Sequence, residues 1–256
     1  MMNKIKPPEF ETQFAADIFH GLTTYPKSLS SKYFYDKRGD ELFQQIMHLP
    51  EYYLTGMEFS ILEQNREQIA RAFNSEKGFD LIELGAGDGK KTKILLRHFM
   101  EEKFSFRYCP VDISKNVLTQ LSESLEKEFP GIKVEPKQGM YREVLERLSE
   151  YRERKKVILF LGSNIGNLSQ EEAVSFLKKI SASMNSEDLF FMGADQKKHP
   201  QKVLDAYNDS SGVTAAFNKN LLTRINRELD ANFDPEAFLH WPVYTIPRPE
   251  WPKVIW

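Results

Sequence analysis

The chain has 256 residues, which suits one large domain or one domain with a smaller lobe. Its 35 lysines and arginines nearly balance its 37 aspartates and glutamates, and the net charge of −2 argues against an electrostatically driven nucleic-acid binder. The single cysteine, Cys109, excludes a disulfide scaffold and a cysteine-based zinc site. The charged fraction of 28% and the aromatic fraction of 12% argue against a disordered chain.

The first part of the chain, residues 1–75, has the pattern of helices. Phe14, Ile18 and Leu22 recur at the spacing of one helix face, and the runs 42–46 and 61–73 show a similar apolar periodicity. No run in this part has the alternation or the continuous apolar character of a strand. We therefore predict that residues 1–75 form the N-terminal helical part of a lobe.

Residues 76–197 change in character, because short apolar runs alternate with amphipathic segments. Such an alternation predicts a parallel sheet that is covered by helices on both faces, since its strands are apolar without alternation. The predicted strands are residues 79–84, 106–113, 132–136, 157–161 and 189–192. The predicted helices between them are residues 91–99, 117–129, 141–148 and 170–184, the last with Ser169 as N-cap.

No further strand is predicted after Gln196. Two helices are expected, at 203–207 and 217–229, with a polar loop between them. The end of the chain, residues 240–256, is rich in proline, holds all three tryptophans and has no periodicity. We assign residues 198–256 to a second part of the lobe with an atypical tail.

A glycine-rich loop follows the first strand. Gly85 and Gly87 would let the backbone approach a ligand closely, and the next helix would present its positive N-terminus. Asp112 ends the second strand, 25 positions after Gly87, where an acid can accept both ribose hydroxyls of a nucleoside. Lys91 and Thr92 occupy the region of the further glycine that a dinucleotide fold needs. This favours S-adenosylmethionine (SAM) over NAD, although a glycine pair alone also suits an ordinary turn.

Two other segments are candidates for substrate binding. The polar turn at residues 162–167 follows the fourth strand and could present a carbonyl to a reacting amine, or be an ordinary turn. Tyrosines cluster at 33–36 and 51–53, where they could close over a small cationic substrate or pack a helical lobe onto a sheet.

The sequence lacks the motifs of several kinds of function. The five histidines have no metal-ligand spacing, and neither a P-loop nor a nucleophile elbow occurs. No apolar run is long enough for a membrane span, and the N-terminus has no export signal. We expect a cytoplasmic monomer that acts on a small molecule and has no metal, nucleic-acid or membrane partner.

The motifs together resemble the SAM-dependent histidine Nα-methyltransferases of the ergothioneine pathway, from about Tyr25 to His240. The segments that carry the resemblance are residues 33–39, 49–55, 83–92, 160–167, 206–218 and 224–229. It implies a class I, Rossmann-like α/β methyltransferase sheet with a small helical substrate lobe. It also implies that an amino acid is the substrate and that L-histidine is methylated to its trimethyl betaine.

The resemblance also implies roles for single residues. Tyr35 and Tyr52 would be catalytic, surrounding the substrate amino group together with the Gly162 carbonyl. The residues implied to bind SAM are Gly85, Gly87, Lys91, Asp112 and Tyr141. Those implied to bind the substrate are Gly162, Asn167, Tyr207 and Thr214.

The sequence departs from the family pattern in two places. Met140 and Tyr141 stand where histidine-specific members carry an acid and a phenylalanine, and this segment is more similar to fungal enzymes that methylate prenylated tryptophan. The pattern of strands six and seven is missing, so residues from about 245 to 256 could be a truncated or frameshifted end, or a natural short variant. The alternatives are therefore an N-methyltransferase of another amino acid or an indole derivative, or a truncated SAM-binding protein without activity.

Overall fold

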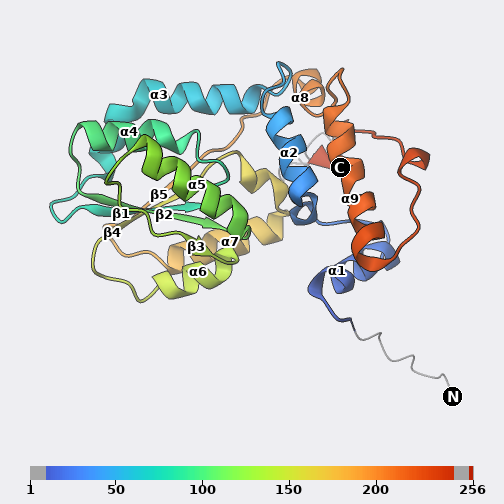
Figure 1. The fold of residues 1–256 in the computed structure, drawn as a ribbon, viewed down its shortest axis with the longest axis horizontal. Helices are drawn as coiled ribbons and strands as arrows, with labels where there is room; N and C mark the ends of the chain where they lie inside the picture. Colours follow the sequence, from blue (N-terminus) through green and yellow to red (C-terminus); the bar gives the residue numbers. More distant parts are fainter. Residues whose placement is uncertain (1–9, 245–253, 256) are drawn as a thin grey trace. The chain divides into compact units, whose positions relative to one another are not determined.

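A computed structural model describes residues 10–244 and 254–255 of the chain (Figure 1). They fall into two units, which we describe separately. The sheet unit comprises Tyr53–Lys198 with Val254, and the lobe unit comprises residues 10–52 and His199–Tyr244 with Ile255.

The sheet unit is built on a five-stranded parallel sheet with the order β3-β2-β1-β4-β5. Its strands are β1 (Phe79–Leu84), β2 (Phe106–Asp112), β3 (Lys137–Gln138), β4 (Lys155–Phe160) and β5 (Leu189–Met192). The order reverses direction between β1 and β4, so the connections that leave these two strands go to opposite sides. In open α/β sheets, ligands bind at the carboxyl ends of the strands at such a point.

Helices cover both faces of this sheet, as its continuous apolar strands predict (Figure 1). One face packs against α3 (Tyr53–Phe73), α4 (Thr92–Glu101) and α5 (Lys115–Glu128). The other face packs against α6 (Tyr141–Leu148) and α7 (Gln170–Ala182), with the short η2 (Asn164–Asn167) after β4. The predicted fold class, a Rossmann-like α/β sheet of the class I type, is confirmed.

The third strand differs from the prediction. Residues 132–136 were expected to form it, but only Val134 pairs there, in an isolated bridge to Tyr108, and β3 begins at Lys137. Pro136 accounts for the difference, because proline has no backbone N–H with which to continue the ladder. The strand is consequently short.

Packing within each unit sets the boundaries between the two units. The sheet unit begins at Tyr53, whereas the sequence placed the first boundary at residue 75. The reason is that Leu62, Ile69 and Phe73 of α3 are buried in the core against the sheet. The second boundary, after Lys198, lies one residue from the predicted one.

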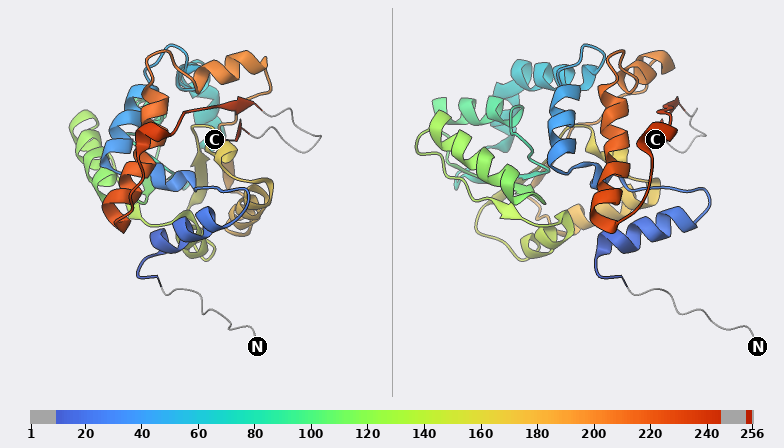
Figure 2. Two further views of the ribbon diagram at one scale, coloured as in Figure 1. Left: turned by 90° about the vertical axis from the view of Figure 1, so that its right-hand side faces the viewer. Right: turned by 45° about the vertical axis from the view of Figure 1, so that its right-hand side comes forward.

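The lobe unit consists mainly of helices. Helices α2 and α9 lie side by side in it, drawn in blue and orange-red in Figure 2. Their apolar faces, with Leu42, Ile46, Phe217 and Leu221, form its buried core. The elements are α1 (Gln13–Thr23), η1 (Ser31–Phe34), α2 (Lys37–Ile46), α8 (Pro200–Ala206), α9 (Val213–Leu229), η3 (Pro235–Ala237) and β6 (Val243–Tyr244), with β7 (Val254–Ile255) paired to β6. Most of the atypical tail, at 245–253 and 256, lies outside the described residues.

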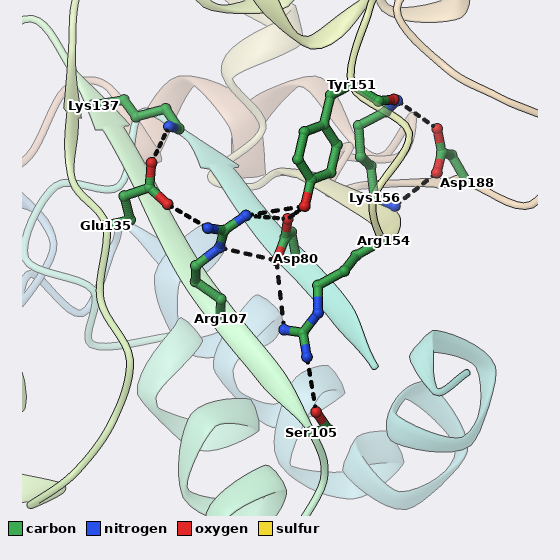
Figure 3. A network of polar contacts seen from close by, with 9 residues as sticks. All are labelled: Asp80, Ser105, Arg107, Glu135, Lys137, Tyr151, Arg154, Lys156 and Asp188. Atoms are coloured by element: carbon green, nitrogen blue, oxygen red, sulfur yellow. Dashed lines mark hydrogen bonds and ion pairs between the residues drawn. The ribbon is translucent and has the colours of Figure 1, made fainter. Parts of the chain in front are cut away.

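Charged side chains are buried at the amino ends of the strands, away from the glycine loop (Figure 3). Asp80 accepts hydrogen bonds from Arg107 at 2.7 and 3.1 Å. Beside this pair, Lys156 forms a 3.0 Å ion pair with Asp188, and both side chains are buried. Because each charge has a partner, the network satisfies the buried charges at the base of the sheet, and we assign it no reactive role.

Candidate active site

The glycine loop after β1 depends on left-handed backbone conformations. Gly85 and Gly87 have φ angles of +76° and +53°, which other residues adopt at a cost. A Cβ atom on Gly85 would lie 2.5 Å from the hydroxyl of Tyr141, whereas a Cβ on Gly87 would meet no atom within 4 Å. Gly85 is therefore required by its surroundings, and Gly87 borders open space.

Asp112 lies beside this loop, at the end of β2. Its Oδ1 accepts a 2.9 Å hydrogen bond from the Ser114 amide, and its Oδ2 lies 3.4 Å from the Gly87 amide nitrogen. Burial raises the pKa of this carboxyl, and the backbone hydrogen bonds partly oppose that effect. The long contact to Gly87 leaves acceptor capacity for ligand hydroxyls.

Glu83 is a buried residue of β1 to which the sequence assigned no role. Its carboxylate accepts a 2.6 Å hydrogen bond from the Thr92 hydroxyl and another from the hydroxyl of Tyr108. Burial raises its pKa to about 7, although these hydrogen bonds oppose the shift. Glu83 ties the start of the glycine loop to the start of α4. An acid within an apolar strand is a signal that could have identified it.

The turn after β4 brings several predicted residues together. Gly162 and Ser163 have φ angles of +78° and +57°, so two successive residues are left-handed. A Cβ on Gly162 would lie 3.4 Å from both the Asn164 amide nitrogen and the Lys91 ammonium nitrogen. The same Asn164 amide lies 3.7 Å from the Cβ position of Gly85. The two loops therefore meet around Asn164, a residue that the sequence did not single out for a role.

A further residue near these loops, Glu58 of α3, was also missed by the sequence analysis. Its carboxylate oxygens lie 2.8 and 2.9 Å from the Gly162 amide nitrogen, and one of them pairs with Lys91. No sequence motif marks Glu58, because the residues around it in α3 have the pattern of an ordinary amphipathic helix. Asn167, by contrast, is an exposed residue at the end of η2, and its predicted role stays a prediction.

The predicted tyrosines of the lobe unit form one aromatic group. The Tyr35 ring packs edge-on against Phe43 and Phe217, at centroid distances of 5.5 and 5.6 Å. Tyr52 packs edge-on against Phe43 at 6.4 Å and against Tyr207 at 6.0 Å. The structure thus brings Tyr35, Tyr52 and Tyr207 together within the lobe.

Tyr207 and Thr214 are held by hydrogen bonds of their neighbours. His240 Nε2 lies 2.8 Å from the Tyr207 carbonyl oxygen, and its Nδ1 lies 3.2 Å from the Asn218 amide nitrogen. This pair of partners suits the neutral imidazole with its proton on Nε2. Thr214 is buried, and its amide donates a 2.7 Å hydrogen bond to Asp209. Burial alone would raise the pKa of Asp209, but its hydrogen bonds lower it below the usual range.

No group of three or more histidine, cysteine, aspartate or glutamate residues in the described part of the chain could hold a metal ion. No helix in that part of the chain is both long and apolar enough to cross a membrane. Cys109 is buried as predicted, and burial raises the pKa of its thiol to about 12, so it is unreactive.

The parallel sheet, the left-handed glycine loop after β1 and the acid that ends β2 define a nucleoside-binding α/β domain of the class I methyltransferase type. The chain belongs to the family of SAM-dependent, histidine-specific methyltransferases, whose family model matches residues 14–251. It is thus a methyltransferase that uses SAM, as the sequence predicted.

Three curated proteins are similar to this chain. The histidine N-alpha-methyltransferase of Mycolicibacterium smegmatis is 38% identical over 88% of this chain and 68% of that protein. The ergothioneine biosynthesis protein 1 of Schizosaccharomyces pombe is 30% identical over 84% of this chain and 29% of that protein. The 4-dimethylallyltryptophan N-methyltransferase of Claviceps purpurea is 29% identical over 93% of this chain and 73% of that protein.

Proposed function

We propose that this protein transfers methyl groups from SAM to the α-amino group of L-histidine and carries the reaction to the trimethyl betaine. The observation that carries the proposal is the convergence of Gly85, Lys91, Tyr141 and Gly162 at the carboxyl ends of β1 and β4. The relative from Mycolicibacterium smegmatis, at 38% identity, supports the choice of substrate.

The residues of the sheet unit fit SAM. Gly87 borders open space beside the Asp112 carboxylate, which suits a ribose with two hydroxyl donors. The exposed apolar side chains of Ile113 and Met140 would contact the adenine ring, because Ile113 follows Asp112 and the amide of Gly139, the residue before Met140, donates a 3.1 Å hydrogen bond to the Asp112 carbonyl. Tyr141, which follows Met140, would contact SAM as well. Lys91 would supply a cation for the carboxylate of SAM. Bound SAM supplies the methyl group from its sulfonium.

The chain's own residues would position the amine for the reaction. A nucleophilic amine must be neutral. The α-amine has a pKa of about 8 in a peptide and a higher one in a free amino acid, whose carboxylate favours the ammonium form, so the site must favour the neutral amine. We assign this role to the Gly162 carbonyl and the hydroxyls of Tyr35 and Tyr52, which accept hydrogen bonds from the amine or pass its proton to water. Holding the reacting atoms aligned, about 3–3.5 Å apart, supplies much of the rate.

The remaining assignments concern the substrate carboxylate and the two parts of the chain. Asn167 and Tyr207 would bind the carboxylate, with Thr214 nearby. Residues 76–197 would bind SAM, while residues 1–75 and 198–256 would supply the substrate lobe, with α3 also packed against the sheet. We further expect a cytoplasmic monomer that acts on this small molecule without nucleic-acid or membrane partners.

A second candidate is methylation of another amino acid or of an indole derivative. It is favoured by Met140 and Tyr141, which replace the acid and phenylalanine of histidine-specific members, and by the relative that acts on 4-dimethylallyltryptophan.

A methyl-transfer assay separates these candidates. The protein is incubated with SAM and each of the twenty amino acids or 4-dimethylallyltryptophan, and the methylated products are identified by mass spectrometry. Histidine is expected to be converted to its trimethyl form. No turnover of histidine, with another substrate accepted, would overturn the choice of substrate. Absence of turnover with every substrate, while calorimetry shows that SAM binds and that histidine does not alter its binding, would overturn the proposed activity.

A further inference from the structure

Glu58 contacts two parts of the proposed site at once. Its side chain is only 14% exposed, and its two oxygens lie 2.8 and 2.9 Å from the Gly162 amide nitrogen. One of these oxygens also pairs with the Lys91 ammonium group. A single carboxylate thereby joins the turn after β4 to the residue that precedes α4.

Gly193 makes room for this carboxylate. A Cβ on Gly193 would lie 1.9 Å from Glu58 Oε1 and 3.1 Å from its Cδ. The Gly193 amide donates a 2.9 Å hydrogen bond to the Phe160 carbonyl, so its backbone is held where β5 ends beside β4. Gly193 does not have a left-handed conformation, since its φ lies outside that range. It is needed for the space that Glu58 occupies.

We infer that Glu58 is a positioning residue, which orients the backbone at Gly162 and holds Lys91 in place for the methyl-transfer reaction. The inference rests on the proposed function. The peptide between Leu161 and Gly162 is hydrogen-bonded on both sides. Glu58 accepts a hydrogen bond from its N–H, and the side-chain amide of Asn164 donates a 2.9 Å hydrogen bond to its carbonyl. Rotation of this peptide would change φ of Gly162 and move the Gly162 carbonyl, which lies next along the chain.

The pairing with Lys91 has a separate effect. A lysine side chain has large rotamer freedom, so a fixed counter-ion restricts where its ammonium group lies. The carboxylate needs its charge for this role, whereas an uncharged oxygen is sufficient to accept from the Gly162 amide. Two substitutions can therefore separate the two roles.

Glu58→Gln keeps an oxygen that accepts from the Gly162 amide but turns the NH₂ of its side-chain amide toward Lys91. We expect KM for SAM to rise roughly tenfold, while kcat stays within about threefold of the wild-type value. Glu58→Ala removes both contacts, so kcat should also fall by roughly tenfold to a hundredfold. Glu67→Gln, at an exposed position of the same helix, is the matched control and should change neither constant.

Gly193→Ala provides an independent perturbation of the same carboxylate. By itself it should reproduce the loss of kcat seen in Glu58→Ala, because the new methyl group displaces the carboxylate. In the Glu58→Ala background the clash is gone, since the next atom of Leu161 is 3.5 Å away. The second substitution should then change kcat by less than about twofold.

Hydrogen exchange of the Gly162 amide measures its contact with Glu58 in the absence of SAM. It should quicken by about tenfold or more in Glu58→Ala and Gly193→Ala, and stay near the wild-type rate in Glu58→Gln. Wild-type constants and a protected Gly162 amide in both alanine variants would overturn the inference. Additive losses of kcat in the double variant would also overturn it.

The outcomes for the two proposals are distinguishable. If the wild-type protein neither binds SAM nor methylates an amino acid, the proposed function fails, and the exchange of the Gly162 amide still decides whether Glu58 fixes this backbone. If the wild-type protein is active but the Glu58 variants match it, only the role of Glu58 fails. Should Glu58→Ala not fold, Glu58→Gln and Gly193→Ala give the decision.

Discussion

The side chains of Asp36 and Asn220, which are 184 positions apart in the chain, are joined by a 2.8 Å hydrogen bond. The same carboxylate caps α2 through the Gly39 amide at 2.8 Å and pairs with Arg227 at 2.8 Å. Burial alone would raise the pKa of Asp36, but Arg227 and the other donors hold it below its ordinary value. Asp36 therefore anchors α2 against α9, the helix that carries Phe217 of the aromatic group.

This anchor predicts unequal effects of its two side-chain partners. Asn220 is buried, so Asn220→Ala should lower the free energy of unfolding by about 1–3 kcal/mol. Arg227 is half exposed, so Arg227→Ala should lower it by less than about 1 kcal/mol. Urea unfolding at pH 7 measures both values. A larger loss for Arg227→Ala than for Asn220→Ala would contradict the assignment.

Glu83 predicts a pH dependence of stability. Its pKa is raised from 4.5 to about 7 by burial, so folding favours the protonated carboxyl. Its contribution to stability is fully present below pH 4.5 and is lost as the pH rises through 7. The loss is about 3 kcal/mol in total.

The Glu83→Gln variant is the test of this dependence. The difference in unfolding free energy between wild type and variant should shift in favour of the variant from pH 5 to pH 8, as measured by urea unfolding at several pH values. Parallel stability profiles of the two proteins would show that Glu83 does not titrate in this range. The hydroxyl of Tyr108, whose pKa burial raises well above 10, stays protonated throughout.

The buried pair of Lys156 and Asp188 predicts strong coupling at the base of the sheet. Asp188 also accepts 2.6 Å hydrogen bonds from the amides of Lys156 and Asn185, so Asp188→Ala should cost about 3–5 kcal/mol of stability. Lys156→Met should cost less, because those two amides still satisfy the carboxylate. The double variant should lose less than the sum of both losses in a denaturant titration. Additive losses would count against a direct interaction.

The two glycines of the loop should respond differently to alanine. Gly85→Ala should destabilise the protein more than Gly87→Ala, since only the former brings a methyl group against Tyr141. Adding Tyr141→Phe should restore part of the stability of Gly85→Ala, because the ring carbon beneath the hydroxyl lies 3.6 Å from the new Cβ. Thermal unfolding without ligand measures these effects. Equal losses for both alanine variants, with no recovery, would argue against the close contact.

The proposed roles of Tyr52 and Asn167 predict a separation of turnover from SAM binding. Tyr52→Phe and Asn167→Ala should each lower kcat/KM for the amino acid by at least about tenfold and change the Kd for SAM by less than about threefold. Tyr25→Phe, at a tyrosine that is 98% exposed, is the control. Steady-state kinetics and calorimetry give the two constants. Equal losses of turnover and of SAM binding would contradict these roles.

Local sequence patterns were sufficient to predict the parallel sheet. Continuous apolar runs such as residues 157–160 of β4 are buried on both faces, so helices must cover both sides of the sheet. The glycine loop was predictable for a similar reason, because a backbone that turns sharply after a strand needs glycine. Asp112 was predictable because it is the last residue of a strand that the sequence pattern predicts. The third strand was misplaced because a single proline outweighed an otherwise favourable pattern.

The contacts of Glu58, Asn164 and Asp36 were not predictable from the sequence. Each depends on partners that lie elsewhere in the chain and are brought close only when helices pack, as Glu58 and Gly162 are across 104 positions. The unit to which α3 belongs was decided in the same way, by the burial of Leu62 and Phe73 against the sheet. The sequence by itself determined the class of fold and the place of the loop, because periodicity and backbone freedom are local properties. The tertiary structure decided which charges and amides meet, because those partners are selected by the packing of distant segments.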